Sequence, residues 1–371
     1  MKIECLKERL LEAVVGAERV TGKQLPLQIL SAVIIEAIDK QIIIKSTNLD
    51  LYTEYNIPAK IEKKGIVAVP GRILTQLINH LPNQSKITLE LIDSNLHIYT
   101  PETKVIIKTI LFEDFPESPK ISKEKPTIVI PSNVFLNGLT SVCFAAAVSD
   151  IKPEVSSVFL DNDGDDLVFT STDTFRLAQK RIELKKGNSS VKNISNTLIP
   201  IKNVLEIIRV FENKNEDLSI WIQPHQIVFA TNGIILTSRL IDGVFPDVNQ
   251  IFPRKSTTEV IALKHELTQS LRIVTVFTDK FNRVGIKVMV KDKHCELYSK
   301  NQETGEGVVK LDATLEGEDV DMQFNAKYIL DVFQSTHDDS ITINFNGKDK
   351  PVIITNTNNP SFTYLVMPLH Q

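Results

Sequence analysis

The acidic run Asp161-Asn162-Asp163-Gly164-Asp165-Asp166 is the stretch of this sequence that most resembles a metal-binding loop. Carboxylate and amide oxygens bind calcium, and an EF-hand loop needs glycine at its sixth position and glutamate at its twelfth. Here the glycine is fourth and the twelfth residue is Thr172. The run is better interpreted as the turn of a β-hairpin, so we expect no metal site there.

Other reactive side chains are scattered along the chain. Gly305-Glu306-Gly307 lacks the third glycine of a dinucleotide-binding loop, because Lys310 stands in its place. His294 and Cys295 are adjacent, and neighbouring residues of a strand face opposite sides, so they could not readily share one metal. The sequence also lacks a serine-hydrolase elbow, a P-loop and a His-Glu-x-x-His motif. We therefore predict no catalytic residue, no cofactor and no metal.

Composition narrows the class of protein further. At about 100–200 residues per domain, a chain of 371 residues suggests about two to four domains. The net charge of −4 argues against a simple DNA-binding protein, although basic residues can gather on one face. Cys5, Cys143 and Cys295 are too far apart to suggest a disulfide framework or a zinc site. The start of the sequence lacks a secretory-signal pattern and no apolar run could span a membrane, so we expect a cytoplasmic protein.

The elements that position these residues repeat three times along the chain. Ser46-Thr47-Asn48-Leu49-Asp50-Leu51 follows an apolar stretch that begins fifteen residues earlier, and Ser171-Thr172-Asp173 does the same with an offset of 125 residues. Ser299-Lys300-Asn301 is a weaker third copy at the same spacing from its own apolar stretch. Fixed-period self-similarity of this kind indicates repeated structural units, which serve either to build an extended or closed surface or merely to add stability.

Each unit carries two amphipathic helices, because apolar residues recur three and four positions apart, and a pair of alternating strands follows the second helix. The predicted hairpins are Ile87–Leu91 with Leu96–Tyr99, Leu218–Ile222 with Gln226–Phe229, and Ile341–Phe345 with Val352–Ile354. Each repeat is therefore predicted to contain the element order β-α-β-β-β roughly twice. We expect an α+β fold, with helices packed on one face of antiparallel sheets, in three domains at 1–122, 127–253 and 257–371.

Three passages resemble a known family. Residues 171–178 (STDTFRLA), 240–247 (LIDGVFPD) and 364–368 (YLVMP) are similar to motifs of the bacterial sliding clamps, the beta subunits of DNA polymerase III. The resemblance covers the whole chain. It implies a non-catalytic processivity factor, a head-to-tail homodimer whose ring encircles double-stranded DNA without regard to sequence. It also implies loading by a clamp loader, and use by the DNA polymerase III alpha subunit and by repair polymerases through short linear motifs.

In such a ring the helices face the DNA, and basic side chains on them would meet phosphates. The candidates on helices are Lys7, Arg72, Lys202, Arg209, Lys264, Arg272 and Lys327. The resemblance adds two loops, one with Lys23 and Gln24 and one that runs from Ser149 to Lys152.

The resemblance also implies an apolar cleft that binds partner peptides between the second and third domains. The matching residues are Val155, Thr172, Thr174, Phe175, Arg176, Leu177, Pro246, Ile251, Phe281, Asn325, Tyr328, Pro351, Leu365, Met367, Pro368 and Leu369. Thr174 replaces a frequent glycine, which removes backbone freedom if φ is positive there. Gln250 stands where a basic residue is common.

For the contact between subunits, the resemblance points to a strand edge of the first domain that meets the third domain. We expect Val105 and Ile107 to alternate outward on that strand, with Val276 or Phe277 as partners. A different interpretation remains open, namely a repeat-built scaffold that binds peptides and never encircles DNA. An enzyme is a third alternative that no motif supports.

Overall fold

The computed structural model describes residues 1–22, 27–82, 86–122, 124–149, 151–184, 194, 196–248, 250–253, 255–336, 338–357 and 361–369. These residues form two compact units. The first unit holds Met1–Asn133 and Leu205–Leu240, and the second holds the rest of the described chain. The middle repeat therefore contributes elements to both units. The predicted DNA-facing residues Lys23 and Gln24 lie outside the described residues.

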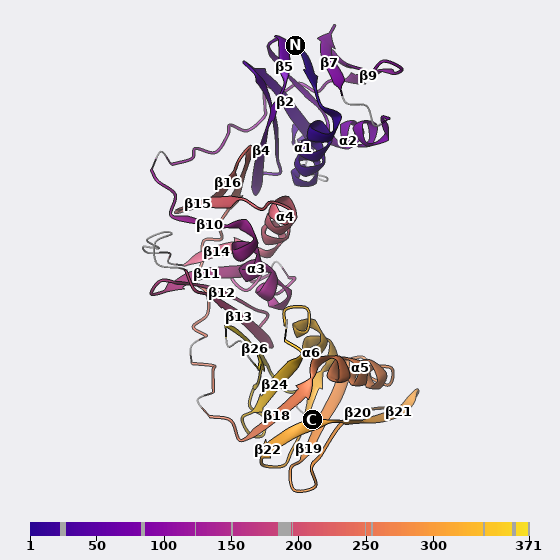
Figure 1. Ribbon diagram of the computed structural model, residues 1–371, viewed down its shortest axis with the longest axis vertical. Coiled ribbons are helices and arrows are strands. Elements are labelled where there is room, and N and C mark those ends of the chain that lie inside the picture. The colour runs from indigo at the N-terminus through magenta and orange to yellow at the C-terminus, as the bar shows by residue number, and fades with distance from the viewer. Residues whose placement is uncertain are drawn as a thin grey trace. The chain divides into compact units, whose positions relative to one another are not determined.

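Two α-helices form in each repeat, as the sequence predicts. Within the described residues they are α1 (Lys7–Val20), α2 (Gly71–His80), α3 (Ser132–Val142), α4 (Ile201–Phe211), α5 (Lys264–Thr275) and α6 (Ala326–Val332). Their apolar stripes are buried, as Leu10 and Val14 of α1 and Leu74 of α2 illustrate. Helix α1 packs against α2, and α5 packs against α6 (Figure 1). No described helix is long and apolar enough to cross a membrane.

The strands follow the predicted order of one strand, a helix and three strands, twice in each repeat. The first repeat has β1 (Lys2–Cys5), β2 (Ala32–Ile38), β3 (Gln41–Thr47), β4 (Leu51–Pro58), β5 (Lys60–Lys63), β6 (Gly65–Pro70), β7 (Ile87–Ile92), β8 (Asn95–Tyr99) and β9 (Lys104–Lys108). The second has β10 (Ile128–Pro131), β11 (Ser157–Asp163), β12 (Asp166–Thr172), β13 (Arg176–Ile182), β14 (Thr197–Pro200), β15 (Asp217–Gln223), β16 (Gln226–Thr231) and β17 (Ile234–Arg239).

The third repeat has β18 (Thr258–Leu263), β19 (Arg283–Met289), β20 (His294–Asn301), β21 (Gly305–Leu311), β22 (Ala313–Gly317), β23 (Val320–Asn325), β24 (Ser340–Phe345), β25 (Val352–Asn356) and β26 (Phe362–Val366). The second repeat matches the predicted order without change. The first and third each add one short strand, β5 and β22, which lie at the edges of their sheets. The three predicted hairpins form in antiparallel register.

All strand pairs among the described residues are antiparallel, and sheets run from one repeat into the next. The first unit contains the sheets β5-β1-β7-β8-β9 and β10-β15-β16-β17-β4-β3-β2-β6. The second contains β14-β11-β12-β13-β26-β25-β24-β18-β22 and β21-β20-β19-β23 (Figure 1). The joins are β17 with β4, where Ile234 pairs with Tyr55, and β13 with β26, where Leu177 pairs with Leu365. Backbone hydrogen bonds therefore connect neighbouring repeats.

One hydrogen bond recurs in all three repeats and confirms that the landmark serines occupy equivalent positions. The hydroxyl of Ser46 donates to the carbonyl of Ala17 (2.6 Å) near the end of α1. Ser171 donates in the same way to Val142 at the end of α3, and Ser299 donates to Val274 near the end of α5. Each buried serine therefore ties a strand to the end of the first helix of its repeat.

The acidic run at 161–166 forms the predicted β-hairpin. Strands β11 and β12 pair as far as Asp163 and Asp166, and Gly164 takes a φ of 62° in the turn between them. Arg181 of β13 donates to Asp163 (2.8 Å) and to Asp166 (3.4 Å). Within the described part of the chain, no three His, Cys, Asp or Glu side chains gather closely enough to hold a metal ion.

Candidate functional site

The turn between β12 and β13 begins the candidate cleft. The hydroxyl of Thr172 accepts a hydrogen bond from the amide of Thr174 (3.0 Å) and donates to the carbonyl of Arg176 (2.6 Å). This arrangement holds Thr174 at a φ of 78°, a value that L-residues with branched side chains rarely adopt. Thr174 therefore has the positive φ at which the replacement of glycine removes backbone freedom. Leu49 has the same φ of 78° in the equivalent turn of the first repeat.

Arg176 lies at the centre of the site and is 8% exposed. Its Nε atom donates to Asp173 Oδ2 (2.9 Å), and its Nη1 atom donates to Asp331 Oδ2 (2.7 Å) on α6. The guanidinium carbon lies 4.4 Å from the ring centroid of Tyr328, within cation–π distance. Burial alone would lower the pKa of Arg176, but hydrogen bonds and charge from Asp331 and Asp173 reverse that effect and raise it.

Hydrogen bonds also fix the C-terminal segment beside this turn. The hydroxyl of Tyr364 donates to the carbonyl of Tyr328 (2.9 Å), and burial raises the pKa of this phenol strongly. The amide of Met367 donates to the carbonyl of Phe175 (2.8 Å), which extends the β13–β26 ladder by one bond. The amide of Leu369 donates to the carbonyl of Gln323 (2.7 Å). The tail is therefore held against both the second and the third repeats.

An apolar cluster packs next to the turn. It consists of Leu177, Leu198, Phe245, Val248 and Leu365, and Met367 packs against it. The structure thus brings together three of the predicted cleft residues, Leu177, Leu365 and Met367. Leu177 and Leu365 are each only 2% exposed, so they lie in the buried interior of the cluster.

The remaining predicted cleft residues divide into three groups by exposure. The exposed ones are Phe175, Pro246, Ile251 and Phe281. Thr174 is exposed as well, and the half-buried ones are Asn325, Tyr328, Pro351 and Leu369. The buried ones are Val155, Thr172 and Pro368. Asn325 caps α6, since its side chain accepts from the amide of Lys327 (3.0 Å). Whether these residues bind peptide stays a prediction.

Sequence reasoning missed three residues that contact Arg176, namely Asp331 of the third repeat and Phe144 and Asp173 of the second. Asp331 supplies a carboxylate, and Phe144 adds a second ring 5.8 Å from the guanidinium. Asp331 lies 155 positions from its partner, and a lone aspartate on a helix carries no signal of such a contact. Asp173 could have been found, because a carboxylate three residues before an arginine can bond both its backbone and its side chain.

The DNA-facing prediction is wrong for Lys7. This side chain is only 5% exposed, because its ammonium donates to the carbonyl of Leu81 just past the end of α2. Lys264, at the same place in the third repeat, is half-buried and donates to the carbonyl of Thr336. Ser132 plays the same part in the second repeat, since it donates to the carbonyl of Lys214. In each repeat, this residue therefore ties the start of the first helix to the residues that follow the second helix.

The other predicted DNA-facing residues that the structure describes are exposed. They are Arg72, Ser149, Lys152, Lys202, Arg209, Arg272 and Lys327. Arg209 pairs with Glu206 on its own helix. Arg72 borders a cavity of about 440 Å³ between α1 and α2, together with Thr21, Thr75 and Gln76. Their contact with DNA stays a prediction.

The predicted interface strand is an edge strand, but the predicted side chains face the wrong way. Strand β9 is the last strand of its sheet, and it pairs only with β8 among the described residues. Ile107 is 4% exposed and Val105 is half-buried, whereas Ile106 is 55% exposed. Val105 and Ile107 pair with the buried residues Ile98 and Leu96 of β8, which places them on the core side.

The expected partner surface in the third repeat also differs in detail. Val276 is 70% exposed, as the prediction requires. Phe277 is half-buried and its ring covers β21, where a Cβ atom added at Gly307 would lie only 2.8 Å away. Strand β21 is an edge strand of its sheet, and Val308 on it is 62% exposed.

Comparison with known proteins matches the whole chain to one family. Models of the N-terminal, central and C-terminal domains of the DNA polymerase III beta subunit match residues 1–119, 129–247 and 249–370. The beta sliding clamps of Bacillus subtilis and Synechocystis are 25% and 28% identical to the chain, and each alignment covers 100% of it and 99% of the relative.

Solved structures agree with this assignment at the level of the fold. The crystal structure of the Bacillus subtilis sliding clamp matches with a TM-score of 0.94 at 24% identity, over 100% of this chain and 99% of that one. The beta subunit from Thermotoga maritima matches with a TM-score of 0.92 at 24% identity, with the same coverage. The chain therefore belongs to the DNA polymerase III beta subunit family, the beta sliding clamps.

Proposed function

We propose that two copies of this chain close head to tail into a ring around duplex DNA and tether DNA polymerase to it. The observation that carries the proposal is the match of all three domains, in order, to the beta clamp family. The clamp makes and breaks no bond. It increases processivity because a tethered polymerase stays at high effective concentration near the primer end.

Two different edge strands support a head-to-tail contact. A heterologous interface joins unlike surfaces and closes into a ring when the rotation permits it. Strand β9 offers Ile106 between Lys104 and Lys108, and strand β21 offers Val308 near Glu306. Both apolar side chains are exposed, and charged residues flank each of them, Lys104 and Lys108 beside Ile106 and Glu306 and Lys310 beside Val308. We therefore place Ile106, with Val276 and Val308, in the subunit contact in place of Val105 and Ile107.

Enclosure explains why a chain with a net charge of −4 can act on DNA. A ring needs only weak, sequence-independent contacts with phosphates, and weak contacts permit sliding. The exposed basic residues of the helices, such as Arg72, Lys202 and Arg272, would supply them. A scaffold that binds peptides without encircling DNA is the alternative, and no observation on the molecule favours it.

Partner proteins would dock at the apolar cluster beside Arg176. The cluster is apolar, and the exposed side chains of Phe175 and Ile251, which lie within three residues of its members Leu177 and Val248 along the chain, could contact the apolar anchors of a peptide. The expected partners are the DNA polymerase III alpha subunit, the clamp loader and repair polymerases, all through short linear motifs. The protein would act in the cytoplasm. Its three domains would span residues 1–122, 127–253 and 257–371.

Light scattering tests the ring through its subunit contact. The wild type should have twice the chain mass of 41.7 kDa, and Ile106→Asp should have the mass of one chain, because the substitution replaces an apolar contact with a carboxylate that would lose its hydration in the interface. Thr103→Asp is a matched control, because it adds the same charge at a half-buried position just before β9. It should leave the protein a dimer. A dimer that persists in Ile106→Asp would contradict the proposed edge, and a monomeric wild type would contradict a stable ring.

A further inference from the structure

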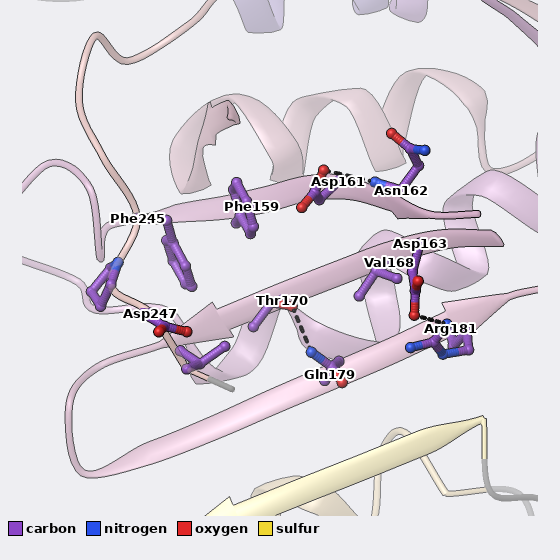
Figure 2. A pocket seen from close by; sticks show the side chains of 12 residues that line it. Phe159, Asp161, Asn162, Asp163, Val168, Thr170, Gln179, Arg181, Phe245 and Asp247 are labelled. Atoms are coloured by element: carbon purple, nitrogen blue, oxygen red, sulfur yellow. Dashed lines mark hydrogen bonds and ion pairs between the residues drawn. The ribbon is translucent and has the colours of Figure 1, made fainter. Parts of the chain in front are cut away.

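A cavity of about 480 Å³ lies in the second repeat, on the sheet face opposite the buried residues Val158 and Leu160. Its floor comes from alternate residues of β11, β12 and β13, and its wall is the segment Phe245–Val248 (Figure 2). The volume falls within the range typical of ligand sites, about 300–1,000 Å³. None of the predicted cleft residues except Pro246 borders this cavity.

The two ends of the cavity differ in chemistry. At one end the rings of Phe159 and Phe245 stack, with centroids 4.8 Å apart and planes 7° from parallel, and Figure 2 shows them side by side. Phe159 is half-buried, so part of its ring remains accessible. A flat, apolar surface of this kind suits a planar group that can stack on it.

The rest of the cavity is acidic. Three carboxylates border it, those of Asp161, Asp163 and Asp247, against the single guanidinium of Arg181. Arg181 is already paired with Asp163 (2.8 Å) and also with Asp166 (3.4 Å) outside the cavity. Among the described residues, Asp161 accepts one hydrogen bond, from the amide of Asn162 (2.9 Å), and forms no ion pair. The cavity therefore presents the carboxylate of Asp161, which forms no ion pair among the described residues, near an aromatic surface.

The cavity adjoins the proposed peptide cleft. Phe245 and Val248 of its wall belong to the same apolar cluster as Leu177 and Leu365. Along β13, Leu177 and Arg181 lie on the same face of the sheet, four residues apart, which is about 13 Å in a strand. A peptide bound at the cluster could therefore place a side chain in the cavity with roughly four further residues of extended chain.

We propose that this cavity binds an arginine side chain of the same partner peptide whose apolar anchors occupy the cleft. The inference rests on the proposed function of that cleft. A guanidinium can stack on the ring of Phe159 and donate to the carboxylate of Asp161, which is the combination that the two ends of the cavity offer. The charged contact would select partners by the residues that flank their anchors.

Fluorescence polarisation with paired peptides tests the inference. One labelled peptide carries Leu-Phe anchors and an arginine about four residues before or after them, and its twin carries citrulline, which has the same shape without the charge. The arginine is placed before the anchors in one peptide pair and after them in a second pair. In the pair that binds more tightly, we expect the arginine peptide to bind about fivefold to tenfold more tightly than its citrulline twin, which is the effect expected of one partly exposed charged contact. Asp161→Asn should abolish this difference and leave the affinity of the citrulline peptide unchanged.

Asp165→Asn is the matched control, because this exposed aspartate lies in the same hairpin but does not border the cavity. It should retain the full preference for arginine. Equal affinity for the two peptides, or a preference that survives Asp161→Asn, would overturn the inference while the cleft still binds the citrulline peptide. If neither peptide binds the wild type, the cleft itself is refuted and the inference falls with it.

Discussion

Arg176 on β13 and Asp331 on α6 form a direct ion pair, with 2.7 Å between Nη1 and Oδ2, across the boundary of the second and third repeats. Both side chains are largely buried, at 9% and 19% exposed. The guanidinium also lies 4.4 Å from the centroid of the Tyr328 ring, so the pair and this ring fix α6 against β13. The site is therefore built from contacts between repeats as well as from the sequence motifs.

Removal of one member of this pair should destabilise the protein strongly. Asp331→Asn leaves the buried guanidinium with Asp173 as its remaining carboxylate partner, and breaking a buried pair costs about 3–5 kcal/mol. Because Asp173 stays in place, we expect the free energy of unfolding, measured with urea, to fall by an amount in the lower part of that range. Asp165→Asn on the exposed hairpin should change the free energy of unfolding by less than about 0.5 kcal/mol. Equal effects of the two variants would contradict this role.

Relief of the strained turn should stabilise the chain. Thr174 is held at a φ of 78°, where a non-glycine residue costs about 1–3 kcal/mol. Thr174→Gly should therefore raise the free energy of unfolding, by about 1 kcal/mol after the greater entropy of the unfolded glycine chain is included. Leu49→Gly, at the same φ in the first repeat, tests the same effect away from the cleft. A fall in stability for both variants would show that neither turn is strained.

Substitutions at Lys7 and Arg72 should have contrasting effects on stability and on diffusion along DNA. Lys7→Met keeps most of the side-chain length but leaves the buried carbonyl of Leu81 without its donor, which costs about 1–3 kcal/mol of stability. It should leave the rate of one-dimensional diffusion on DNA unchanged. Arg72→Gln, at an exposed position, should spare stability and speed diffusion, because one phosphate contact is lost. Single-molecule tracking and thermal melting measure the two properties, and the reverse pattern would refute the assignment.

Two buried cysteines should resist alkylation in the folded protein. Burial raises the pKa of the Cys5 thiol to about 12 and that of the Cys295 thiol to about 11. A thiol is reactive only as the thiolate, so at pH 8 a raised pKa leaves about one thousandth or less of each in that form. Iodoacetamide with mass spectrometry should label both slowly in buffer and fully in urea. Rapid labelling of either in the folded state would show that it is not buried.

Sequence patterns predicted the elements better than the directions of single side chains. The hairpins and the recurring serines followed from alternation and from the repeat of 125 residues. Val105, Ile106 and Ile107 are three consecutive apolar residues, so their pattern fits either face of a strand, and only the pairing with β8 decides which residue points outward.

Long-range contacts account for the remaining differences. Lys7 looked like a solvated residue at a helix start, because its acceptor belongs to the residue after α2, 74 positions away. The Arg176–Asp331 pair spans 155 positions, and no periodicity encodes such a contact. The family resemblance located the turn at 171–178 and Tyr328, but not the ring of Phe144 or the carboxylate of Asp331 on α6.

The most direct test of the central claim is topological. The protein is loaded by its clamp loader onto a nicked circular DNA, separated from unbound protein, and the circle is then cut once with a restriction enzyme. A ring that encloses the duplex should stay on the intact circle and leave within minutes after linearisation, because it slides off the free ends. Bulky protein blocks at both ends should prevent this loss. Equal retention on the linear DNA without blocks would contradict enclosure and support binding by affinity.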